Sequence, residues 1–117
     1  MRAVEYAAAV LLANRLREAR EHADMSTREL AEALGRPQSY VVDIENLSRR
    51  VAVHECWAIA EATGYDLANL VLPPRDEDEV ETWEEALEDF ESGLAELPRR
   101  RKRGEGRGRR KPRERDR

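Results

Sequence analysis

The chain of 117 residues has little of what most catalytic or metal sites need: one cysteine, two histidines and only six aromatic residues. Cys56 alone excludes an internal disulfide, and with His22 and His54 it gives no spacing typical of a metal site. Neither histidine has a serine or cysteine nearby in a nucleophile setting. We therefore expect no enzyme activity, no catalytic residues, no metal and no other cofactor.

Long apolar runs are also missing, because nothing in the chain approaches the roughly 20 apolar residues of a membrane span. The candidate targeting segment at residues 7–13 continues directly as an amphipathic helix, so we expect no signal peptide. Together with the single cysteine, these features predict a reduced, cytoplasmic protein without a membrane partner.

The net charge of −4 hides three blocks of different sign. Residues 1–75 have 9 basic and 11 acidic residues, residues 76–97 have 11 acidic residues and no basic one, and residues 99–117 have 12 basic and 3 acidic residues. A block of like charge usually makes contacts rather than a core. We therefore expect a domain at 1–72, a proline-led acidic segment at 73–98 and a basic tail at 99–117.

The first block reads as helices throughout. Apolar residues at spacings of three and four predict a long amphipathic helix over residues 3–23. Ser26 and Glu29 form a capping-box pattern, so a second helix should cover about residues 27–34 and end at Gly35.

A third helix should begin at 37 or 38, since Pro37 suits a first turn. A fourth helix is expected at 53–63, and a short fifth helix, capped by Asp66, should end near residue 71. The second and third helices with their short turn have the geometry of a helix-turn-helix. Their apolar seam should consist of Leu30, Leu34, Val41 and Ile44, with the small Ala31 where the helices cross.

Residues 16 to about 71 resemble the phage-repressor and Cro-like (XRE-type) helix-turn-helix family. The resemblance rests on "LREAR", "MSTRELAEALGRPQSYV", "IEN", "RR" and "IAEATGYDLANLV". It implies an all-α fold, a compact five-helix DNA-binding domain, here with an extended first helix, an added acidic amphipathic helix and a disordered basic tail. It also implies a structural pair between Arg20 and Glu45, with the arginine fork tying the first helix to the third.

The resemblance places the third helix in the major groove of double-stranded DNA, with its first residues against base edges. The expected base-reading residues are Gln38, Ser39 and Asp43. The expected contacts to the DNA backbone come from hydroxyls and guanidiniums, namely Thr27, Arg36, Tyr40, Arg49 and Arg50. Each of these residues is also open to a plainer interpretation as an ordinary solvated side chain.

Asp43 departs from the family pattern, in which many members have Lys, Arg or Gln at this position. Three interpretations remain open. The carboxylate reads cytosine N4 and rejects other bases, or the helix binds DNA weakly or not at all, or Asp43 pairs locally with an arginine and points away. Two further departures are Thr27, where many members have glutamine, and Leu47, where many have glycine.

The acidic segment predicts one helix over about residues 76–97 with a single apolar stripe. The stripe consists of Val80, Trp83, Leu87, Phe90, Leu94 and Leu97. A coiled-coil dimer is disfavoured, because acidic residues flank the stripe without bases opposite them. The stripe could instead pack on the domain itself, on a sister subunit, or on a basic partner.

The basic tail lacks apolar residues and is expected to be disordered. It either adds salt-sensitive affinity for phosphate, or serves solubility and lies across the acidic helix. Two functions follow for the whole chain. One is a sequence-specific, repressor-like transcriptional regulator that binds DNA as a homodimer; the other is an antitoxin-like interaction protein whose acidic helix holds a basic partner.

Overall fold

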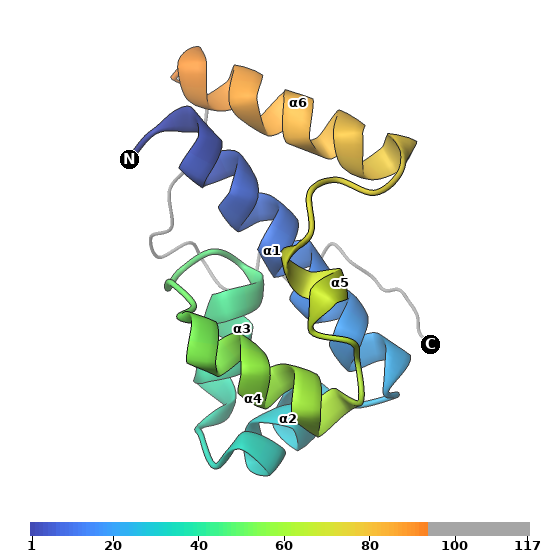
Figure 1. Cartoon of the computed structure of the whole chain (residues 1–117). Coiled ribbons are helices and arrows are strands. Elements are labelled where there is room, and N and C mark those ends of the chain that lie inside the picture. The colour runs from blue at the N-terminus through green and yellow to red at the C-terminus, as the bar shows by residue number, and fades with distance from the viewer. Residues whose placement is uncertain (94–117) are drawn as a thin grey trace.

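The computed structural model describes residues 1–93, which fold into six α-helices without a β-strand in that range (Figure 1). The all-α fold class predicted from the sequence is confirmed. The helices are α1 Ala3–His22, α2 Thr27–Leu34, α3 Gln38–Glu45, α4 Val53–Thr63, α5 Ala68–Val71 and α6 Glu77–Glu91.

Local signals explain where α2 begins and ends. The Ser26 hydroxyl accepts a hydrogen bond from the Glu29 amide at 3.0 Å, and the Glu29 carboxylate accepts one from the Ser26 amide at 2.8 Å. This reciprocal pair satisfies amides that have no partner inside the helix. Gly35 ends α2 with a φ of 69°, a left-handed conformation that a residue without Cβ adopts at little cost.

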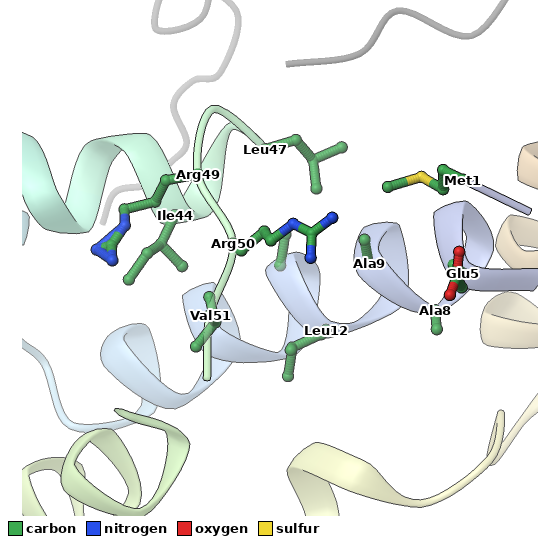
Figure 2. A pocket seen from close by; sticks show the side chains of 11 residues that line it. Met1, Glu5, Ala8, Ala9, Leu12, Ile44, Leu47, Arg49, Arg50 and Val51 are labelled. Atoms are coloured by element: carbon green, nitrogen blue, oxygen red, sulfur yellow. The ribbon is translucent and has the colours of Figure 1, made fainter. Parts of the chain in front are cut away.

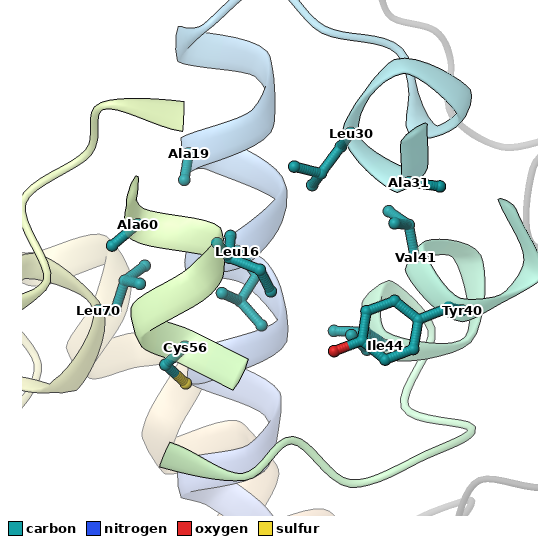
Figure 3. Close-up of a cluster of buried hydrophobic side chains, with 11 residues drawn as sticks. Leu16, Ala19, Leu30, Ala31, Tyr40, Val41, Ile44, Cys56, Ala60 and Leu70 are labelled. Carbon is teal, nitrogen blue, oxygen red and sulfur yellow. The ribbon is translucent and has the colours of Figure 1, made fainter. Parts of the chain in front are cut away.

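The hydrophobic core lies where α1, α2, α3 and α4 meet, and α5 closes it (Figure 3). Leu16 and Ala19 of α1 face Leu30 and Val41 across this core. The expected seam is present, since Leu30, Val41 and Ile44 are buried and Leu34 packs against them. The buried members of the whole hydrophobic core are Leu16, Ala19, Leu30, Ala31, Tyr40, Val41, Ile44, Cys56, Ile59, Ala60 and Leu70.

An ion pair between Arg20 and Glu45 joins α1 to α3. The Nε and Nη2 atoms of Arg20 donate to the two carboxylate oxygens at 2.7 and 3.0 Å, and Nη1 donates to the Met25 carbonyl at 2.9 Å. Burial opposes the charge of Arg20, but the hydrogen bond and the charge of Glu45, together with the charge of Glu21, outweigh it and raise the guanidinium pKa. The last residue of α3 is thereby tied to α1.

Helix α6 packs alongside α1, and α1 lies between α6 and the two helices α2 and α3 (Figure 1). The rings of Tyr6 and Phe90 stack with their centroids 5.6 Å apart. The sequence left three surfaces open for the apolar stripe: the domain itself, a sister subunit or a basic partner. In the described residues the stripe packs on the domain itself. Trp83, Leu87 and Phe90 of the predicted stripe are half-buried, whereas Val80 is 40% exposed, and Ala86 is the buried residue of α6.

The expected extent of α6 was too long, because the helix ends at Glu91 rather than near residue 97. Gly93 follows in a left-handed conformation with φ of 81°, which ends the helical hydrogen bonding. Leu94 and Leu97, the last two residues of the predicted stripe, lie outside the described residues, as does the basic tail at 99–117.

A buried arginine connects α1 to α6. Arg15 is only 1% exposed, and it donates from Nε and Nη2 to the two carboxylate oxygens of Glu79 at 3.1 and 2.8 Å. Its remaining hydrogen bonds go to the backbone carbonyls of Leu70 at 3.2 Å, Leu72, and Pro73 at 2.9 Å. Arg15 thus holds together the first helix, the end of α5 and the start of α6.

Candidate nucleic-acid interface

The first turn of α3 presents polar side chains to solvent. Gln38 and Ser39 are exposed, and the turn before them, residues 35–37, separates α2 from α3. Gln38 donates from Nε2 to the Thr27 hydroxyl at 2.8 Å, which joins the starts of α2 and α3. An expected base-reading residue and an expected phosphate donor therefore lie side by side.

Asp43 shares the exposed side of α3 with Ser39, because the two residues are one helical turn apart. Asp43 is partly exposed, and its carboxylate makes no hydrogen bond or ion pair with any residue in 1–93. The interpretation in which Asp43 pairs with a local arginine therefore finds no partner in the described part of the chain. Among the candidate base-reading residues, Ser39 thus shares its side of α3 with Asp43.

Tyr40 occupies a different position from the one expected for a phosphate donor. Its side chain belongs to the core cluster, and the residue is 8% exposed. In Figure 3 its hydroxyl points from α3 toward the side of α4. There it faces the Glu55 carboxylate, and burial together with this carboxylate raises the tyrosine pKa. Its hydroxyl therefore belongs to the buried cluster around Glu55.

Two arginines contact the Tyr40 ring. The guanidinium carbon of Arg36 lies 4.3 Å from the ring centroid, and that of Arg49 lies 4.7 Å away. Both arginines also approach one carboxylate oxygen of Glu55, at 3.6 and 3.4 Å. These distances fit cation–π contacts and ion pairs, so the two candidate backbone contacts are held by one tyrosine and one glutamate.

Glu55, which the sequence analysis did not single out, is buried at the start of α4. It accepts a hydrogen bond from the Ala52 amide at 2.8 Å. This backbone hydrogen bond, the Tyr40 hydroxyl and the two arginines lower the glutamate pKa, so Glu55 is charged near neutral pH. Its place three residues after the helix cap was visible in the sequence, but its arginine contacts were not.

Arg50 points in another direction from Arg49 and lies beside a shallow groove (Figure 2). The groove has a volume of about 330 Å³ and runs between the first half of α1 and the loop after α3. Figure 2 shows the Arg50 side chain extending toward Ala9, with Leu47 and Met1 at the rim. The lining is mainly apolar, with Glu5 and the two arginines as its charged residues.

Leu47 has a φ of 67°, a conformation that costs an L-residue with a bulky side chain roughly 1–2 kcal/mol. Many family members have glycine at this place, and glycine adopts this left-handed conformation readily. The backbone at Leu47 therefore has the conformation expected for that glycine. Leu47 keeps that turn and adds an apolar side chain to the groove.

Other kinds of site find no support in the described residues. No cluster of three or more histidine, cysteine or acidic side chains within residues 1–93 has the arrangement of a metal site. Burial raises the pKa of the Cys56 thiol, which lowers its reactivity. The helices in this range are all too short or too polar to cross a membrane.

Comparison with protein families gives one match, to the HTH_3 helix-turn-helix family over residues 16–70. Curated proteins and solved structures gave no match. The matched residues run from the second half of α1 through α5, and they include α2, the turn at Gly35 and the whole of α3. Members of this family are typically non-enzymatic regulators. Residues 16–70 of the chain therefore form a Cro/C1-type helix-turn-helix domain of the HTH_3 family, a DNA-binding domain.

Proposed function

We propose that the protein is a sequence-specific, repressor-like transcriptional regulator that binds double-stranded DNA as a homodimer in the cytoplasm. The observation that carries this proposal is the exposed side of α3, which presents Gln38, Ser39 and Asp43 within an HTH_3 domain. A homodimer follows from the general use of such domains on two-fold related half-sites.

Each residue on this side of α3 has a chemical role. The Gln38 carboxamide pairs with the N6 and N7 edge of adenine, and the Ser39 hydroxyl donates or accepts. The Asp43 carboxylate accepts from cytosine N4 and repels a misplaced phosphate. Thr27 together with Arg36, Arg49 and Arg50 contacts the DNA backbone, which sets the position of α3 in the groove.

The test begins with selection of a preferred duplex from a randomised pool by the full-length protein. Gln38→Ala should weaken binding to that duplex by roughly 1–3 kcal/mol and leave affinity for a random duplex nearly unchanged. Both titrations are made at one salt concentration. Glu61→Ala, an exposed position on α4, is the matched control and should change neither affinity.

An equal loss on both duplexes would remove Gln38 from base reading. The Gln38 side-chain amide has two roles, a hydrogen bond to Thr27 and the proposed contact with a base. Thr27→Val separates them, because it removes the hydrogen-bond partner and leaves the amide in place. A smaller loss of selectivity than in Gln38→Ala is expected from it, since the amide still reaches the base.

An antitoxin-like interaction protein is the second candidate, and one observation favours it. The apolar side of α6 is occupied by α1, and its outer side is mainly acidic, with Glu77, Asp78, Glu81, Glu84, Glu85, Glu88, Asp89 and Glu91 exposed beside Val80. A basic partner would bind there through charge alone. Failure of the selection to enrich any sequence would favour this scaffold role over the regulator.

A further inference from the structure

Four side chains, each from a different segment, form one cluster beside the recognition helix. Arg36 comes from the turn before α3, Tyr40 from α3, Arg49 from the loop after α3, and Glu55 from α4. The ring of Tyr40 contacts both guanidiniums, at 4.3 and 4.7 Å, and the Glu55 carboxylate pairs with both, at 3.6 and 3.4 Å. The cluster therefore connects the segments at the two ends of α3 through a single buried ring.

The acidic and the basic side chains of this cluster differ in their exposure to solvent. The Glu55 side chain is 8% exposed, whereas those of Arg36 and Arg49 are 43% and 36% exposed. The acid is hidden and the two bases face solvent. One carboxylate cannot neutralise two guanidiniums, so the cluster keeps a net positive charge at its surface. An anion that contacts both arginines would complete the neutralisation.

Ordering of long side chains is the main obstacle to phosphate binding by arginine. A free arginine side chain samples many rotamers and must lose that freedom on binding. Stacking on a fixed ring and pairing with a fixed carboxylate remove much of this freedom before DNA arrives. Tyr40 is itself fixed, because it is part of the hydrophobic core.

We propose that Tyr40 and Glu55 are positioning residues that hold Arg36 and Arg49 as a two-arginine clamp for the DNA backbone. This inference rests on the proposed function, and it gives Tyr40 a role different from direct phosphate contact. The clamp acts on every sequence alike, because phosphate contacts carry no base information. It sets the register in which Gln38 and Ser39 meet the bases.

The main test is Tyr40→Leu, which removes the ring without changing any charge. Affinity should fall roughly three- to tenfold on the selected duplex and on a random duplex alike. The slope of log affinity against log salt should become shallower by about one, because about one phosphate contact is lost. Tyr40→Phe keeps the ring and should restore the affinity and most of the slope.

A double-mutant comparison shows whether Tyr40 acts through the arginines. In a protein that carries Arg36→Ala and Arg49→Ala, Tyr40→Leu should cause no further loss of affinity. The same loss in both backgrounds would mean a merely structural role and would overturn the inference. Unchanged affinity of Tyr40→Leu in the parent protein would overturn it as well.

Loss of stability is separated from loss of positioning by a core variant and by spectroscopy. Ile59→Ala removes a buried side chain of α4 outside the cluster and should leave DNA affinity unchanged where it is folded. The Tyr40 ring should shift the side-chain proton signals of Arg36 and Arg49 upfield in the DNA-free protein. Tyr40→Met, which better fills the ring's volume, repeats the titration if Tyr40→Leu unfolds.

Failure of the clamp and failure of the proposed function give different results. If Arg36→Ala with Arg49→Ala binds every duplex as tightly as the parent, the clamp is wrong while sequence-specific binding stands. If the parent protein prefers no sequence but the arginine variants still weaken binding, the clamp stands and the regulator proposal fails.

Discussion

Arg15 of α1 and Glu79 of α6 are joined by two hydrogen bonds of 3.1 and 2.8 Å across 64 positions of sequence. The arginine side chain is 2% exposed and the carboxylate 12%. Arg75 also donates to Glu79, at 2.6 Å, so two guanidiniums share one carboxylate. This pairing attaches α6 to α1 in the folded domain. Loss of the carboxylate would leave a buried cation without its counter-charge.

Glu79→Gln should therefore lower the free energy of unfolding by about 3 kcal/mol at pH 7. The variant retains an oxygen that accepts a hydrogen bond but removes the charge that Arg15 faces. Chemical denaturation followed by circular dichroism measures the change. Glu85→Gln, at an exposed position on the same helix, is the matched control and should change stability by less than about 0.5 kcal/mol.

The same pair predicts how stability depends on pH. Hydrogen bonds from Arg15 and then Arg75 hold the pKa of Glu79 far below its ordinary value of 4.5. A depressed folded-state pKa stabilises the protein above the unfolded value, and this stabilisation is lost as pH falls below it. Stability should drop more steeply below about pH 4.5 in the parent than in Glu79→Gln, with a slope that approaches roughly 1.4 kcal/mol per pH unit for one group. Parallel curves would contradict this role of Glu79.

Much of the fold could be predicted from local sequence. The capping pair Ser26–Glu29, the turn at Gly35 and the periodic apolar residues are local signals. The five helices that they predict within residues 1–72 lie within a few residues of those observed. The contact between Arg20 and Glu45 followed only from family resemblance, since nothing local specifies it.

Contacts between distant segments were the part that the sequence could not predict. Arg15 lies one turn from both Leu11 and Ala19, on the buried side of α1, and that placement was the one signal of a buried partner. The identity of the partner depends on how α6 docks. Similarly, the sequence suggested an exposed Tyr40, because a tyrosine hydroxyl can donate a hydrogen bond to phosphate. In the fold the Tyr40 ring lies in the hydrophobic core.

Asp43→Asn should strengthen binding to random duplexes and relax the preference at one base pair. The change replaces an acceptor that repels phosphate with a group that both donates and accepts. Selections from the same randomised pool, one with the parent and one with the variant, measure it. Identical preferences together with identical affinities would show that the Asp43 side chain does not face DNA.

Deletion of residues 99–117 should lower affinity on every duplex and flatten the dependence of log affinity on log salt. The segment has 12 basic residues, and fewer counterions are released when they are absent. A tail of equal length made of glycine and serine is the control for length. An unchanged slope would exclude direct phosphate contact by this segment.

Neutralisation of the acidic helix by the same segment predicts a different salt profile. Its deletion would then weaken binding mainly at low salt, where screening extends over about 30 Å at 0.01 M rather than about 8 Å at physiological strength. A salt titration of the full-length and shortened proteins on one duplex separates the two.

The distance in sequence between Arg15 and Glu79 also sets an order in time during synthesis. The chain emerges from the ribosome with α1 first, and Arg15 remains without its carboxylate partner until α6 has been made. Helix α6 is therefore a late intramolecular cover for the earliest helix. A chain that terminates before residue 79 would expose apolar surface and an unpaired cation, and cellular proteases would remove it faster than the complete protein.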